Sequence, residues 1–188
     1  MEKNRKKVVL PLFIAGIMVF SIFGVIIDSL SNTPPPTQKI SYKGYEFIYD
    51  GQLWSTVKEK TRIEFLFNPN EIETVYTAGL IEKIAAHKKV YITMSQKEQL
   101  VQEKERLRQI IAGIMKIPVV NACPQDEEGC ENLPLKSCSD ALVNEVLIIK
   151  IEQGTNNMIQ EEGSCIGIIG NAEYLTKITE KIRLERLL

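Results

Sequence analysis

The chain has 188 residues, 44% of them hydrophobic, and a formal net charge of −1. Four of its 23 basic residues and two of its 24 acidic residues precede residue 29, so 19 basic and 22 acidic residues follow. This mildly acidic balance argues against nucleic acid as a partner, because nucleic-acid binding requires a basic surface.

Residues 1–7 form a basic leader, and residues 8–27 form an unbroken apolar run without a charged side chain. Twenty helical residues extend about 30 Å, which matches the hydrocarbon core of a bilayer. Basic flanks stay on the cytoplasmic side. The sequence therefore predicts a single-pass signal-anchor in the cell membrane. Residues 8–27 would lie in the lipid bilayer, with the N-terminus in the cytoplasm and everything after Asp28 outside.

A cleaved signal peptide is the alternative, because Ser29-Leu30-Ser31 resembles a cleavage site. Signal peptides have apolar regions of only about 7–15 residues, which favours a retained anchor. Residues 28–39 contain Pro34-Pro35-Pro36 and predict an extended, proline-rich stalk. The remaining residues, 40–188, have the usual length of one domain.

Aromatic and β-branched residues predict strands within 40–57, with a type I′ hairpin turn at Asp50-Gly51. The alternating pattern of 62–67 predicts a further strand, and Asn68-Pro69-Asn70 a turn. Apolar spacing predicts a short helix over 78–87, followed by a strand over 90–94.

Ser95 and Glu98 have the spacing of a capping box, which predicts a helix from there to about Met115. Residues 119–138 are expected to be irregular, and 145–152 to form a buried strand. Two short strands (158–160 and 165–169) and a last helix that begins at Asn171 complete the domain. Because helices and strands mix without a regular alternation, the predicted class is α+β.

All four cysteines, Cys123, Cys130, Cys138 and Cys165, fall in the predicted outer domain. An even number of cysteines in an oxidising compartment predicts two disulfides. Three pairings are open, and we favour Cys123–Cys130 with Cys138–Cys165, because the first would close a small acidic loop. The C-x6-C, C-x7-C and C-x26-C gaps differ from zinc knuckles and from the C-x-x-C redox motif.

Other candidate sites have simpler interpretations, and no catalytic, cofactor-binding or metal-binding residue is predicted. The single histidine, His87, is expected at the surface or at a helix C-terminus. The acidic run 126–131 lacks the spacing of a calcium loop and is expected to be a solvated loop. The glycine-rich segment 163–170 lacks the lysine of a phosphate loop and predicts a buried strand. The aromatic residues around Trp54 predict core packing rather than a recognition surface.

The basic start, the apolar span and the tail CSDALVNEVLIIKIEQGTNNMIQEEGSCIGIIG (138–170) resemble uncharacterised single-pass membrane proteins of archaeal genomes. This resemblance implies no activity. The anchor, stalk and disulfides favour a non-catalytic accessory or binding module of the cell envelope, with an envelope protein as its partner. The alternative is an envelope enzyme whose active site is assembled from residues that are far apart in the sequence.

Overall fold

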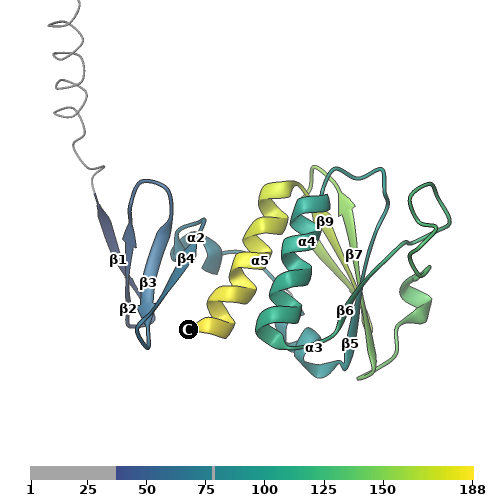
Figure 1. The fold of residues 1–188 in the computed structure, drawn as a ribbon, viewed down its shortest axis with the longest axis horizontal. Coiled ribbons are helices and arrows are strands. Elements are labelled where there is room, and N and C mark those ends of the chain that lie inside the picture. The colour runs from purple at the N-terminus through teal and green to yellow at the C-terminus, as the bar shows by residue number, and fades with distance from the viewer. Residues whose placement is uncertain (1–36, 78) are drawn as a thin grey trace, which may run out of the picture. The chain divides into compact units, whose positions relative to one another are not determined.

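The computed structural model describes residues 37–77 and 79–188, and Lys39–Leu188 form one compact unit (Figure 1). The predicted leader, the predicted membrane span and most of the predicted stalk lie outside the described residues. Within the described ranges, no helix has both the length and the apolar character needed to cross a bilayer. Helices and strands occur in mixed order, which confirms the predicted α+β class.

Two sheets organise the unit. The strands are β1 (Gln38–Tyr42), β2 (Tyr45–Tyr49), β3 (Trp54–Lys58), β4 (Thr61–Phe65), β5 (Lys89–Met94), β6 (Val119–Ala122), β7 (Val146–Gln153), β8 (Met158–Glu162) and β9 (Cys165–Gly170). The α-helices are α2 (Pro69–Glu73), α3 (Leu80–Ala86), α4 (Val101–Ile110) and α5 (Ala172–Leu187), with a π-helical turn η1 (Ile111–Met115) and a 3-10 turn η2 (Cys138–Asp140).

The first sheet has the strand order β1-β2-β3-β4, and β3 pairs antiparallel with both of its neighbours. Glu59 and Lys60 connect β3 to β4, and both have positive φ angles, 50° and 69°. Two such residues form a type I′ turn, whose twist matches that of the strands.

The predicted hairpin at Asp50-Gly51 exists, but the predicted turn type is wrong. Tyr49 pairs with Trp54, so four residues connect β2 to β3. The carboxylate of Asp50 accepts hydrogen bonds from the backbone N–H groups of Gln52 and Leu53, at 3.0 and 2.9 Å. The aspartate side chain thus stabilises a wider loop than a two-residue turn allows.

The second sheet has the order β6-β5-β7-β9-β8, and all its pairs are parallel except β8–β9. The parallel arrangement was not predicted, and β6 falls in a segment that was expected to be irregular. Strand β7 is central and mostly buried, as predicted from its continuous apolar sequence.

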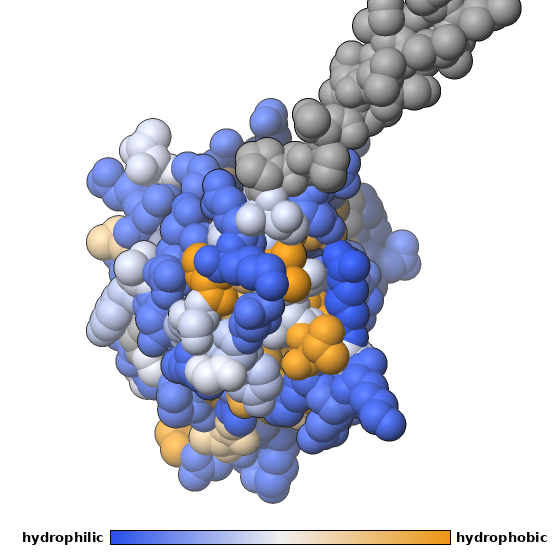
Figure 2. Space-filling model, turned by 90° about the vertical axis from the view of Figure 1, so that its left-hand side faces the viewer, coloured by the Kyte–Doolittle hydropathy of each residue, from blue (hydrophilic) through white to orange (hydrophobic). Residues whose placement is uncertain are grey.

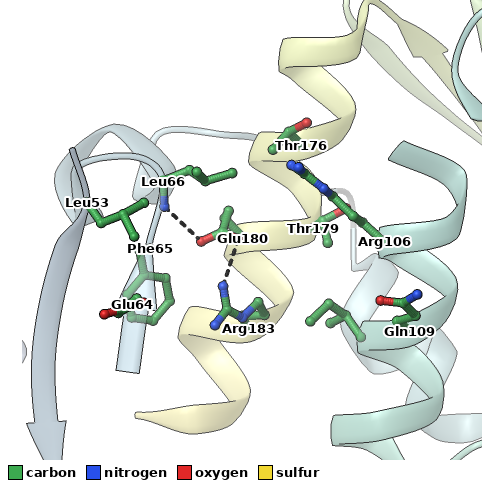
Figure 3. Close-up of a pocket in the computed structure, with 11 residues that line it drawn as sticks. Leu53, Glu64, Phe65, Leu66, Arg106, Gln109, Thr176, Thr179, Glu180 and Arg183 are labelled. Atoms are coloured by element: carbon green, nitrogen blue, oxygen red, sulfur yellow. Dashed lines mark hydrogen bonds and ion pairs between the residues drawn. The ribbon is translucent and has the colours of Figure 1, made fainter. Parts of the chain in front are cut away.

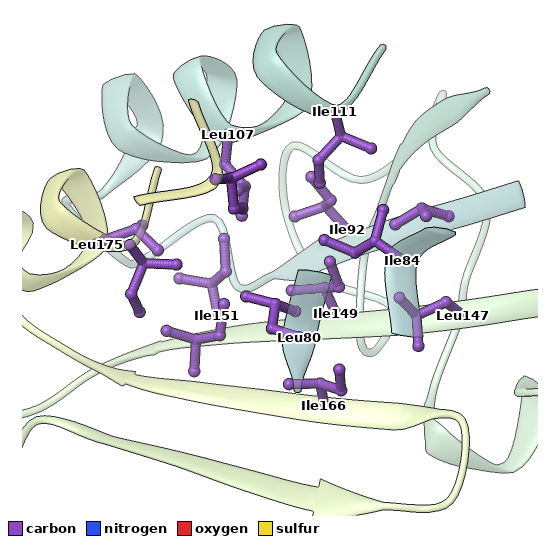
Figure 4. Packing of buried hydrophobic residues seen from close by; sticks show 14 of the residues in the cluster. Leu80, Ile84, Ile92, Leu107, Ile111, Leu147, Ile149, Ile151, Ile166 and Leu175 are labelled. Atoms are coloured by element: carbon purple, nitrogen blue, oxygen red, sulfur yellow. The ribbon is translucent and has the colours of Figure 1, made fainter. Parts of the chain in front are cut away.

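Helices α3, α4 and α5 cover one face of this second sheet (Figures 1 and 4). Alternate residues of β5, β7 and β9 meet apolar side chains of the three helices, and most of these residues are completely buried. Burying one such leucine or isoleucine contributes about 1.5–3 kcal/mol. The larger core includes Ile84, Ile92, Leu107, Ile111, Leu147, Ile149, Ile151, Ile166, Leu175, Ile178 and Ile182.

A smaller core lies against the first sheet and also uses α5. Its buried members are Tyr42, Phe47, Trp54, Phe65, Ile72 and Leu184. Helix α5 therefore belongs to both cores: its first turns pack on the second sheet, and Leu184 packs on the first. This shared helix holds the two sheets in one unit.

One predicted turn and one predicted helix start are wrong. The residues at the expected turn 68–70 begin helix α2, because the Asn68 side chain caps the backbone N–H of Asn70 at 2.9 Å. Ser95 and Glu98 do not form a capping box, and α4 begins at Val101. Ser95 instead donates its hydroxyl proton to Glu127 at 3.0 Å, and Glu98 accepts a hydrogen bond from the backbone N–H of Gln153.

The side of the unit that carries the first sheet is mostly hydrophilic, with a few separate apolar side chains (Figure 2). Val57 on β3 is one exposed apolar residue in this sheet, at 61% exposure. Isolated exposed apolar side chains are ordinary on protein surfaces.

Candidate functional site: a groove beside strand β4

The four cysteines pair as Cys123–Cys130 and Cys138–Cys165, which confirms the predicted disulfides. The first closes a short loop directly after β6. The second attaches the segment between β6 and β7 to β9, on the face of the second sheet opposite the helices. Both bonds crosslink a segment that contributes few side chains to the two hydrophobic cores.

The acidic loop is attached to the segment that follows β5 rather than fully solvated as expected. Glu127 accepts hydrogen bonds from the backbone N–H of Gln96 at 2.8 Å and from the Ser95 hydroxyl. These bonds lower the pKa of Glu127, with the Gln96 N–H as the larger cause. Among residues 37–77 and 79–188, no group of three or more His, Cys, Asp or Glu side chains is arranged to hold a metal ion.

His87 ends helix α3 as expected, but it is only 8% exposed and is not a surface residue. Its ring nitrogens lie 2.7 Å from the Lys83 carbonyl oxygen and 2.9 Å from the Ser164 hydroxyl. The carbonyl can only accept, so Nδ1 donates to it, and in the neutral imidazole Nε2 accepts from Ser164. The serine is 9% exposed as well, so the pair connects α3 to the start of β9 inside the protein.

The glycine-rich segment and the aromatic residues around Trp54 lie where they were predicted to lie, in a buried strand and in a hydrophobic core. Residues Cys165–Gly170 of the glycine-rich segment form β9, a mostly buried strand of the second sheet. Trp54 and Tyr42 belong to the smaller core, and Tyr45 and Tyr49 pack against it.

A groove lies between the first sheet and helices α4 and α5. It consists of two adjoining hollows. The first has a volume of about 320 Å³ (Figure 3) and is lined by Leu53, Glu64, Phe65, Leu66, Arg106, Gln109, Ile110, Thr176, Thr179, Glu180 and Arg183. The second has a volume of about 630 Å³ and is lined by Lys58, Glu59, Thr61, Arg62, Ile63, Glu64, Arg183, Arg186 and Leu187. Glu64 and Arg183 line both hollows, so we treat them as one site, the β4 groove.

Helix α5 forms one wall of the β4 groove. Arg183 donates to the carboxylate of Glu180 at 2.9 Å, and its guanidinium lies 5.2 Å from the ring centre of Phe65. The other carboxylate oxygen of Glu180 accepts from the backbone N–H of Leu66 at 3.4 Å (Figure 3). Near the other end of the helix, Lys58 donates to the Leu187 carbonyl. These contacts keep α5 alongside β4.

The opposite wall is the free edge of the first sheet, because β4 is its last strand. Lys58 and Thr61 flank the two-residue turn and therefore exchange backbone hydrogen bonds. The alternation of an antiparallel pair then directs the N–H and C=O groups of Arg62 and Glu64 away from β3. The next N–H that points to the free edge belongs to Leu66, and it donates to the Glu180 carboxylate.

Positive charge is in excess along the β4 groove. Arg62 pairs with Asp50 and Glu64, and Arg183 pairs with Glu180. Within the described part of the chain, the cations Lys58, Arg106 and Arg186 line the groove without a carboxylate partner. Among the lining carboxylates, Glu59 has no cationic partner within residues 37–77 and 79–188. The site therefore favours an anionic or acidic partner.

The sequence did not predict this site, because its residues come from three distant segments, 53–66, 106–110 and 176–187. Only the strand patterns within 40–57 and 62–67 gave a signal, and they do not show which edge of a sheet is free. No protein-family model, curated protein or solved structure matches this chain.

Proposed function

We propose that this protein is a membrane-anchored extracytoplasmic module that binds an envelope protein in the β4 groove and carries out no catalysis. The observation that supports binding is the groove itself, which combines an apolar floor, an excess of positive charge and a free strand edge. Sites where two structural layers meet are common positions for ligand binding.

The extracytoplasmic location is proposed from residues 1–28 and is consistent with the two disulfides. Disulfides persist in oxidising compartments and are rare in a reducing cytosol. A stalk of about 3 Å per residue would hold the unit within a few tens of ångströms of the bilayer. The partner would therefore be another membrane-associated or envelope protein.

The groove can be tested by photo-crosslinking in cells that express the full chain. A photoreactive amino acid replaces Gln109 or Thr61, which line the two hollows. The matched control is Glu128, an exposed residue of the disulfide loop outside the groove. We expect the two groove positions to capture the same protein and Glu128 not to capture it. Equal capture from all three positions, or none from the groove, would contradict the proposal.

The location can be tested with a membrane-impermeant thiol reagent on intact cells. We expect labelling of the cysteines only after treatment with an impermeant reductant, because they are disulfide-bonded and outside. Labelling that requires cell rupture would place the unit in the cytoplasm and contradict the proposed topology.

A further inference from the structure

We infer that the partner binds the β4 groove as an extended acidic peptide segment that adds a strand to the free edge of β4. This inference rests on the proposed function and specifies the chemistry of its site. Strand addition requires a free edge, room for one more strand, and side-chain pockets beside it.

The free edge offers a matched set of backbone groups. The N–H and C=O groups of Arg62 and Glu64 point away from β3, and residues two apart on one edge recur at about 6.6–6.8 Å. An added strand presents its own donors and acceptors at the same spacing. A phosphate or other small anion would leave this alternating series unpaired.

The space beside the edge suits a single strand. The second hollow lies between β4 and the last turns of α5, and the first hollow continues it to the other end of β4. Neighbouring strands lie about 4.8 Å apart, so an extended segment in the groove would contact β4 and α5 together. At the Leu66 end, the bond from its N–H to Glu180 closes the edge.

The side-chain environment favours an apolar residue and an acidic residue four positions apart. Near Phe65 the groove wall is apolar, with Leu53, Leu66 and Ile110 around it. Toward Thr61 the wall carries Lys58 and Arg186, which lack carboxylate partners within residues 37–77 and 79–188. Phe65 and Thr61 are four residues apart, which is about 13 Å along a strand, and residues four apart face the same side. An apolar-x-x-x-acidic pattern would therefore match both ends.

The backbone requirement can be tested with Glu64→Pro and Glu64→Gln in the full chain. Proline at position 64 removes an N–H that faces the free edge and not β3, and edge strands tolerate proline at such positions. Glutamine removes the charge and keeps the N–H. With the crosslinker at Gln109, we expect Glu64→Pro to reduce capture about tenfold relative to Glu64→Gln.

Charge can be tested with Arg186→Gln and the matched control Lys88→Gln, each of which removes one surface cation. Arg186 lines the second hollow, and Lys88 pairs with Glu145 outside the groove. We expect weaker capture with Arg186→Gln only. Equal capture by the two variants would overturn the acidic character of the partner.

A second measurement avoids variants. The full chain in lipid nanodiscs is mixed with a short peptide that contains Val-Thr-Ser-Thr-Glu between serine and threonine residues, or with its Val-Thr-Ser-Thr-Lys counterpart. We expect the glutamate peptide to bind about tenfold more tightly and to slow amide exchange at Arg62 and Glu64. Strand addition would be overturned if Gln109 captured the partner equally well in Glu64→Pro and Glu64→Gln and if the peptide did not slow amide exchange. That result would leave the binding groove in place. Absence of capture from the groove in the unmutated protein would overturn both.

Discussion

The carboxylate of Glu127 accepts the backbone N–H of Gln96 at 2.8 Å, although 31 residues separate them. This contact attaches the Cys123–Cys130 loop to the segment that follows β5. Gly129 permits the approach, because a Cβ at this position would lie 3.2 Å from the Gln96 side chain, and its φ is +90°. Two kinds of bond therefore hold the loop, a disulfide within it and hydrogen bonds to the segment that follows β5.

Replacing Glu127 with Gln is expected to loosen this attachment, because the amide has one acceptor oxygen and no charge. The Gln96 amide should exchange faster with solvent, as measured by hydrogen exchange. Because the pKa of Glu127 is lowered in the folded protein, its carboxylate stabilises the fold fully above the ordinary glutamate pKa of about 4.3. This stabilisation is lost as the pH falls from there through the lowered pKa. Glu128→Gln, at an exposed position of the same loop, should leave the exchange of Gln96 unchanged.

Removing the disulfides should cost different amounts of stability. Cys138 and Cys165 are 27 residues apart, and Cys123 and Cys130 are 7 apart. Loop-closure entropy predicts a loss of about 3.5 kcal/mol for the serine pair at 138 and 165 and about 2.4 kcal/mol for the pair at 123 and 130. Denaturant unfolding of a chain that begins at residue 37 measures both. A larger loss for the shorter loop would show that native contacts outweigh loop length.

Replacing His87 with Ala should destabilise the protein by about 1–3 kcal/mol, because it leaves the Ser164 hydroxyl and the Lys83 carbonyl without their partner. Ser164→Ala removes one of the two bonds and should cost less. Thermal unfolding measures the difference. The burial of both side chains also predicts that a serine-reactive fluorophosphonate will not label Ser164. Labelling that depends on His87 would instead support the enzyme alternative.

Lys104 on α4 is 6% exposed, and burial lowers its pKa. Lys104→Met keeps a long, unbranched side chain and removes a desolvated charge, so it should stabilise the protein by about 1–2 kcal/mol at neutral pH. Because the folded pKa of Lys104 is depressed, the wild-type chain gains stability as the pH rises through it, and the advantage of methionine should shrink at alkaline pH.

The exposed substitution Lys97→Met is the matched control and should have little effect. Urea unfolding at neutral and alkaline pH measures these differences. Destabilisation by Lys104→Met at both pH values would show that the ammonium group makes a favourable contact in the folded state.

Local patterns predicted most elements, and long-range contacts explain the errors. The alternation in 62–67 and the apolar spacing of α3 and α5 were sufficient, because each buries one face against a sheet. The capping box failed because Glu127, far along the chain, binds Ser95 instead. The parallel order of the second sheet and the free edge of β4 depend on which distant strands pair. Local sequence patterns do not predict pairing between distant strands.

Helix α5 completes both cores, and this has a consequence for how the protein is made. Ile178 and Ile182 fill the larger core and Leu184 the smaller one, so neither interior is closed until residues 172–188 are present. If the chain is exported in an extended form from its N-terminus, neither sheet can be covered before α5 has crossed the membrane. The apolar faces of both sheets would stay accessible until then, and chaperones on the far side of the membrane could bind them.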